Sequence, residues 1–190
     1  MENLDLKFDE IIGECSSLFR SKMADYGATW LLYRDVSLVD QLWIKTKRII
    51  TLEENGDNTL VGEGRADEFV GILNYSIVML MRMFHKDVFP STDEIMADTS
   101  KMNLDVDKVM ELYMTEANKV KELMIKKNHD YGSAWEDMHP SSITDQIVIK
   151  ICRIKNIMKN GGKLLVSEGV DAQLSDIINY CAFALIKMGR

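Results

Sequence analysis

Residues 22–30 read KMADYGATW, and residues 127–135 read KNHDYGSAW. Extending this match at a constant offset of 105 residues places 22–83 on 127–188 without a gap, and 23 of the 62 positions are identical. The unit is far longer than a solenoid repeat, which spans about 20–50 residues. The chain is therefore predicted to contain two copies of one structural unit, and the identical positions are those that the structure or chemistry of the unit constrains.

Apolar residues recur at spacings of three and four, which predicts helices rather than strands. The predicted helices cover about 5–23, 38–54 and 65–85 in the first copy, and 105–127, 143–159 and 169–188 in the second. A three-helix unit alone buries little apolar surface. We therefore predict an all-α fold, a helical bundle made of two tandem three-helix repeats related by a pseudo-twofold axis.

The predicted repeats are residues 1–86 and 105–190, packed as one compact unit and joined by a linker at 87–104. Within the linker, Ser91 and Glu94 have the spacing of a capping box and predict a short helix at about 92–99. In each repeat, Asp-Tyr-Gly predicts the end of the first helix, because glycine tolerates the positive φ of a helix exit. Ser37 and Ser142 are predicted N-caps of the middle helices.

The net charge is −7 and the isoelectric point is about 5.0. An acidic chain argues against binding to a nucleic-acid polymer, which requires clustered Lys and Arg, but not against a small phosphorylated ligand. The N-terminus lacks the apolar run of a signal peptide, and no stretch reaches the ~18 apolar residues of a membrane span. Cys15, Cys152 and Cys181 lie in apolar patterns, so we expect reduced core cysteines in a cytoplasmic protein without membrane contact.

Two cations are repeated in the middle helices. Lys45 and Arg48 are three residues apart and share a face, and Lys150 and Arg153 repeat them. Beside an apolar stripe, these side chains could extend to water. They could also pair with carboxylates of the neighbouring helix or with the phosphate of a ligand, and the pattern leaves these possibilities open.

The third helices carry oxygen donors that differ between the copies. Glu63 and Asn74 are repeated as Glu168 and Asn179, but Asp67 occurs in the first copy alone, and Asp171 and Asp176 occur in the second copy alone. Glu168 and Asp176 lie two turns apart on one helical face. Such a face opposite a Lys/Arg helix suits Mg²⁺ and phosphate, and a solvated or salt-bridged acidic face is the alternative.

The Asp-Tyr-Gly string has a tryptophan three residues later in both copies. Tyr and Trp could fill the space between helices, or they could stack on a nucleobase while Asp accepts hydrogen bonds from it. The candidate base-binding residues are Asp25, Tyr26, Trp30, Asp130, Tyr131 and Trp135.

Taken together, residues 127–132, Lys150, Arg153 and the segment from Glu168 to Tyr180 resemble the nucleotide modification associated domain 1 family. The resemblance covers both copies and implies an all-α domain, a bacterial or phage source and a homodimer. More distantly, it is similar to the all-α NTP pyrophosphatases of the MazG and dimeric dUTPase type. These enzymes bind Mg²⁺ through carboxylates on two helices and release pyrophosphate. The chain departs from that pattern at Ile44 and Ile149, where an acid is expected.

Two main hypotheses follow from this resemblance. In the first, Glu168, Asp171 and Asp176, or Glu63 and Asp67, hold Mg²⁺. Glu168 and Asp176 then act in hydrolysis of a nucleoside triphosphate, and the substrate contacts are Lys45, Arg48, Lys150, Arg153, Asn74, Asn179 and the Asp-Tyr-Gly-Trp residues. In the second, the protein is a nucleotide-binding or structural module without catalysis, and its metal site is degenerate.

Overall fold

The computed structural model describes residues 2–60, 62–164 and 168–190. Within these ranges the chain is helical and contains no strand, which confirms the all-α prediction. The first repeat contributes α1 (Glu2–Tyr26), α2 (Asp35–Glu54) and α3 (Arg65–Phe84), and the second contributes α5 (Val106–Tyr131), α6 (Pro140–Lys159) and α7 (Val170–Lys187). The linker carries α4 (Thr92–Ala97), and short 3₁₀ helices occupy η1 (Thr29–Leu32), η2 (Lys86–Val88), η3 (Thr99–Met102) and η4 (Ala134–Asp137).

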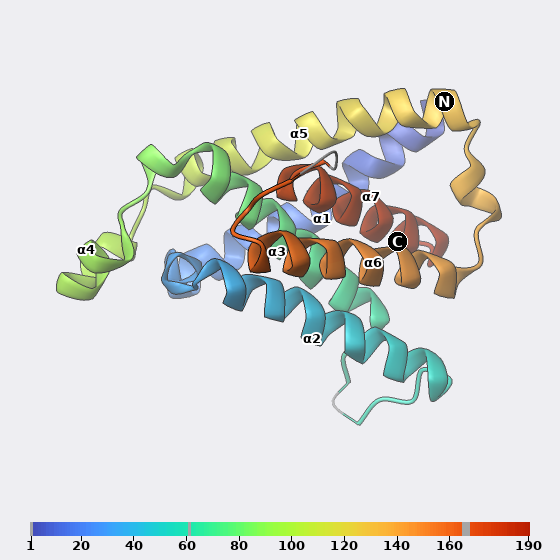
Figure 1. Cartoon of the computed structure of the whole chain (residues 1–190), viewed down its shortest axis with the longest axis horizontal. Coiled ribbons are helices and arrows are strands. Elements are labelled where there is room, and N and C mark those ends of the chain that lie inside the picture. The colour runs from blue at the N-terminus through green and yellow to red at the C-terminus, as the bar shows by residue number, and fades with distance from the viewer. Residues whose placement is uncertain (1, 61, 165–167) are drawn as a thin grey trace.

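The helices form three layers, with α3 and α7 side by side in the middle (Figure 1). One outer layer is the pair α1 and α5, and the other is the pair α2 and α6. The central position follows from sequence, because α3 and α7 are apolar around most of their circumference. Residues 77–81 of α3 are buried in an unbroken run, as are residues 181–185 of α7.

Each helix of the first repeat contacts its own counterpart in the second: α1 packs on α5, α2 on α6 and α3 on α7. A twofold relation between the repeats would produce this pairing, and that relation stays a prediction. Ion pairs cross between the repeats in both outer layers. Lys121 of α5 contacts Asp5 and Asp9 of α1, and Lys155 of α6 contacts Asp40 of α2.

The predicted starts of the middle helices are wrong by three residues. The N-caps are Arg34 and His139, so Ser37 and Ser142 lie inside the first turn instead of capping it. In the second repeat, Pro140 at the first helical position fixes a helical φ and needs no hydrogen-bond acceptor. The His139 side chain also accepts a hydrogen bond from the Ser141 backbone amide.

The helix exits follow the prediction. Gly27 and Gly132 have φ of +63° and +59° directly after α1 and α5. Ser91 and Glu94 form the predicted capping box at the start of α4. Cys15 and Cys181 are buried as expected, but Cys152 is exposed because it lies on the outer side of α6. None of the described helices is long and apolar enough to span a bilayer.

Candidate ligand cavities

Each repeat forms an open cavity beside the turn that follows its first helix. The first cavity has a volume of about 750 Å³ and the second about 390 Å³. All twelve residues that line the second cavity have counterparts, at the offset of 105, among the residues that line the first. The duplicated unit therefore builds the same cavity twice, from equivalent positions of equivalent helices.

Six of these twelve positions carry the same residue in both cavities. They supply two lysines, three aromatic rings and one amide: Lys22 and Lys127, Lys45 and Lys150, Tyr26 and Tyr131, Trp30 and Trp135, Tyr75 and Tyr180, Asn74 and Asn179. Cations, aromatic faces and an amide together suit a ligand with a planar heterocycle and an anionic group.

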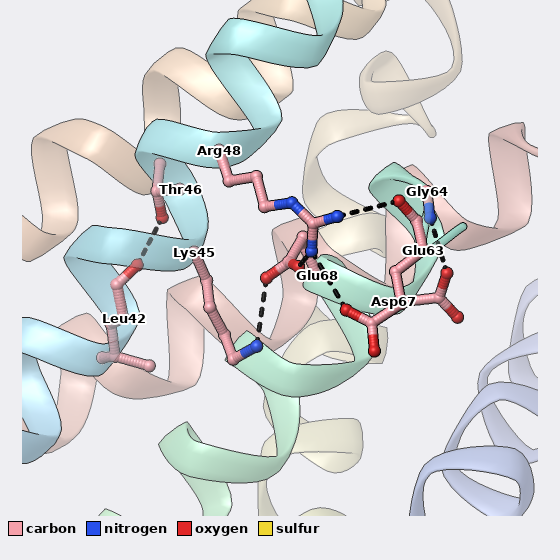
Figure 2. Close-up of polar contacts among 8 residues, drawn as sticks. All are labelled: Leu42, Lys45, Thr46, Arg48, Glu63, Gly64, Asp67 and Glu68. Carbon is pink, nitrogen blue, oxygen red and sulfur yellow. Dashed lines mark hydrogen bonds and ion pairs between the residues drawn. The ribbon is translucent and has the colours of Figure 1, made fainter. Parts of the chain in front are cut away.

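In the first repeat, the kept cations of α2 are bound to acids beside them (Figure 2). Lys45 lies 3.0 Å from Glu68, which is almost fully buried. Arg48 contacts Glu68 and Glu63 and donates a further hydrogen bond to the Glu63 carbonyl. The hydrogen bond that Arg48 donates to the Glu63 side chain, together with the charges of both acids, raises the pKa of Arg48 despite some desolvation. In the first repeat, Lys45 and Arg48 therefore pair with carboxylates, which was one of the possibilities that the sequence left open.

In the second repeat, one acid is shared by two lysines. Asp176 lies 2.6 Å from Lys150 on α6 and 2.8 Å from Lys127 on α5. Burial raises the pKa of the Asp176 carboxyl, but the hydrogen bonds and charges of the two lysines outweigh burial and hold it below its ordinary value. The same contacts raise the pKa of Lys127 against the effect of its burial. This triad joins α5, α6 and α7 at the floor of the cavity.

The acid that binds the kept lysine has moved by one helical turn between the repeats. Glu68 of α3 corresponds to Gln173, and Asp176 of α7 corresponds to Gly71. Lys45 lies across Gly71, where a Cβ atom would stand 2.8 Å from its Cε. The two repeats therefore place one carboxylate near the lysine from positions three residues apart.

The aromatic walls of the two cavities also differ. In the second repeat, Phe183 stacks on Trp135 with ring centroids 4.5 Å apart and 9° between the planes. The counterpart of Phe183 is Val78, and Trp30 instead packs edge-on against Phe89 of the linker. The second cavity therefore has a stacked ring pair on its lining at a position where the first has a valine.

The family model of the nucleotide modification associated domain 1 matches the chain twice, over residues 22–83 and 127–188. The chain belongs to this family. No curated protein and no solved structure matched it. In this family member, the matched segments contain every residue of the second cavity except Met124, so the part of the chain that matches the family model builds nearly all of that cavity. The likeness to NTP pyrophosphatases stays a prediction.

The cavities bring together some of the predicted site residues of this family member and leave others outside. In the first repeat, the lining includes Tyr26, Trp30, Lys45, Glu63, Asp67 and Asn74. In the second, it includes Tyr131, Trp135, Lys150, Asp176 and Asn179. The predicted residues that line neither cavity are Asp25, Arg48, Asp130, Arg153, Glu168 and Asp171.

The predicted magnesium donors are not gathered in one place. Among the described residues, no group of three or more His, Cys, Asp or Glu side chains could hold a metal ion. Asp176 alone of the three acids of the second repeat lines the cavity, and two lysines bind its carboxylate. Asp67 accepts a hydrogen bond from the Gly64 amide at the start of α3. This donor set does not fit Mg²⁺, which needs several free oxygen ligands.

Sequence reasoning missed several lining residues that the repeat itself could have indicated. Lys22 and Lys127 begin the two matched segments, and Tyr75 and Tyr180 directly follow the kept asparagines. All four positions are identical between the copies, which is a signal for shared chemistry. Burial raises the pKa of Tyr75 to about 12 and also raises that of Tyr180. Both phenols therefore stay neutral hydrogen-bond donors at physiological pH.

Proposed function

We propose that this protein binds a nucleotide in at least one of the two equivalent cavities that its repeats form. The observation that carries the proposal is the repetition of the cavity, with two lysines, three aromatic rings and an asparagine at equivalent lining positions. A nucleobase stacks on aromatic faces and pairs its edge with amides. A phosphate group pairs with lysine. The description of the family, a nucleotide modification associated domain, also supports this ligand class.

The acidic surface fits this proposal. A net charge of −7 disfavours a nucleic-acid polymer, whereas two lysines within a cavity can still attract one small anion. Ligand pockets typically have volumes of about 300–1,000 Å³, and both cavities fall within that range.

Hydrolysis of a nucleoside triphosphate with Mg²⁺ stays a prediction. The described carboxylates give no donor set for the ion, so the proposal contains no metal-dependent step. The kept lysines and asparagines can orient a phosphate and a base, which is sufficient for binding.

The test is calorimetric titration of the full chain with nucleoside mono-, di- and triphosphates, with and without Mg²⁺. Each nucleotide is compared with its nucleoside, and pyrophosphate release is followed in parallel. We expect at least about tenfold tighter binding of a nucleotide than of its nucleoside, a difference of about 1.4 kcal/mol. Binding of no nucleotide would overturn the proposal. Pyrophosphate release that requires Mg²⁺ would restore the hydrolase hypothesis.

A further inference from the structure

Unpaired polar atoms surround the second cavity. Asn128 and Asn179 line it, each is more than nine-tenths buried, and each has an amide oxygen with no hydrogen-bond partner among the described residues. Trp135 also lines the cavity, and its indole Nε1 is buried with no hydrogen-bond acceptor among the residues that the structure describes. Gln173, three residues before Asp176 on α7, also has a buried oxygen without a partner among the described residues. Buried polar atoms are normally satisfied, so a group of them at one cavity indicates a missing partner.

The equivalent atoms of the first repeat are satisfied from within the protein. Trp30 donates from Nε1 to the sulfur of Met23, at 3.0 Å. Asn74 donates to the Cys15 carbonyl at 3.1 Å and accepts from the Tyr113 hydroxyl at 2.7 Å. Glu68, the counterpart of Gln173, is bound by two cations. The first cavity therefore uses its polar groups to hold α1, α3 and α5 together.

The charge of the two linings differs in the same direction. The first cavity has two lysines against four carboxylates, a net charge of −2: Lys22 and Lys45 against Glu14, Glu63, Asp67 and Glu68. The second has two lysines against one carboxylate, a net charge of +1: Lys127 and Lys150 against Asp176. The second lining is therefore the more favourable of the two for an anionic ligand.

We infer that the second cavity alone is the ligand site, and that its ligand is a single nucleoside monophosphate. This rests on the proposed function. Lys127 is partly exposed and can turn from Asp176 to the phosphate. The exposed ring of Tyr131 offers a face for the base, and the unpaired atoms of Asn128, Trp135 and Asn179 meet its donors and acceptors. The volume of about 390 Å³ lies at the low end for ligand pockets, which suits one nucleotide with one phosphate.

The repeat supplies a matched pair of variants to test the assignment. Thr29 in η1 and Ala134 in η4 are equivalent, exposed and on the linings of the two cavities. A tryptophan at either position fills the cavity mouth without disturbing the buried core. Calorimetry of the full chain is run with each ribo- and deoxyribonucleoside monophosphate, with the matching triphosphates and with the matching nucleosides. The melting temperature of each variant serves as the folding control.

We expect one bound monophosphate per chain. Ala134→Trp should weaken its binding at least about tenfold, whereas Thr29→Trp should change it less than about twofold. Lys127→Met should also weaken binding about tenfold, and it replaces Ala134→Trp if that variant does not fold. Two bound ligands per chain, or a loss caused by Thr29→Trp, would overturn the assignment and leave the proposed function standing. Binding of triphosphates but not monophosphates would overturn the ligand class. Binding of no nucleotide would overturn both.

Discussion

Asn74 and Asn179 occupy equivalent positions of the two repeats but lie in different environments. Asn74 is bonded to Cys15 and Tyr113, whereas the Oδ1 atom of Asn179 has no partner among the described residues. An apolar residue of similar size removes two hydrogen bonds in the first case and relieves an unpaired oxygen in the second. The structure thus predicts a larger loss of stability at position 74 than at position 179 for the same substitution.

We expect Asn74→Leu to lower the free energy of unfolding by about 1–3 kcal/mol, because it leaves the buried Tyr113 hydroxyl without its acceptor and removes the bond to the Cys15 carbonyl. Asn179→Leu should change it by less than about 1 kcal/mol and should weaken nucleotide binding. Urea unfolding of both variants measures the difference. Equal losses of stability would show that Asn179 has an internal partner and would weaken the assignment of the ligand site.

Asp176 gives the fold a dependence on acid pH. Its folded pKa lies below its ordinary value, so the ionised carboxylate stabilises the fold above the unfolded pKa. That contribution is lost as the pH falls through the folded pKa. We therefore expect Asp176→Asn to be less stable than the original protein at neutral pH, with the gap beginning to close as the pH falls below the ordinary aspartate pKa of about 3.9.

The measurement is urea unfolding at a series of acidic pH values. Asp25→Asn is the control, because Asp25 is exposed and makes no ion pair within the described ranges. A gap between Asp176→Asn and the original protein that stays constant with pH would contradict the role given to the two lysines.

At the scale of the helix, Lys45 and Lys150 occupy equivalent positions but pair with acids from different turns of the neighbouring helix. Glu68 serves Lys45 from α3, and Asp176 serves Lys150 from a position one turn later on α7. Glu68→Gln with Gly71→Asp transfers the arrangement of the second repeat to the first. The added Cβ meets only the flexible end of Lys45, which can shift.

We expect Gly71→Asp to destabilise the original protein, because a second acid then crowds Glu68 and Lys45. In the Glu68→Gln background the same change should stabilise the protein, since the introduced carboxylate becomes the partner of Lys45. A double-mutant cycle of unfolding free energies should give a favourable coupling of about 1 kcal/mol. Additive effects would show that position 71 cannot replace position 68.

The same helices show how far the sequence could be interpreted. The apolar period of α2, α3, α6 and α7 identified the helices, because burial of one face is a local pattern that repeats along the chain. Their starts were less predictable, because His139 and Ser142 both have side chains that could cap α6, and Arg34 precedes α2 without any side-chain capping bond. The partners of Lys45 and Lys150 depend on which turn of another helix lies nearby. The sequence of one helix does not give its distance to another helix. The differences between Glu68 and Gln173 and between Gly71 and Asp176 were nevertheless visible in the aligned copies.

At the scale of the molecule, the two repeats share one core. The middle layer consists of one helix from each repeat, and both outer layers also pair a helix with its counterpart. Each cavity is lined by residues of its own repeat, but the Asn74 bond to Tyr113 shows that the other repeat holds the lining in place. The two repeats therefore differ in how their kept asparagines are used: Asn74 bridges to Cys15 and Tyr113, whereas Asn179 leaves a buried oxygen unpaired among the described residues.

This shared core predicts that neither repeat folds alone. A fragment of residues 1–104 would expose the face of α3 that packs on α7, and a fragment of residues 105–190 would expose the opposite face. We expect each fragment to show reduced helical circular dichroism and no cooperative thermal transition, whereas an equimolar mixture should recover both. The mixture should also recover nucleotide binding, because the second cavity regains its support. A cooperative transition in either fragment alone would mean that the repeat is a self-contained domain and that the middle layer joins two finished units.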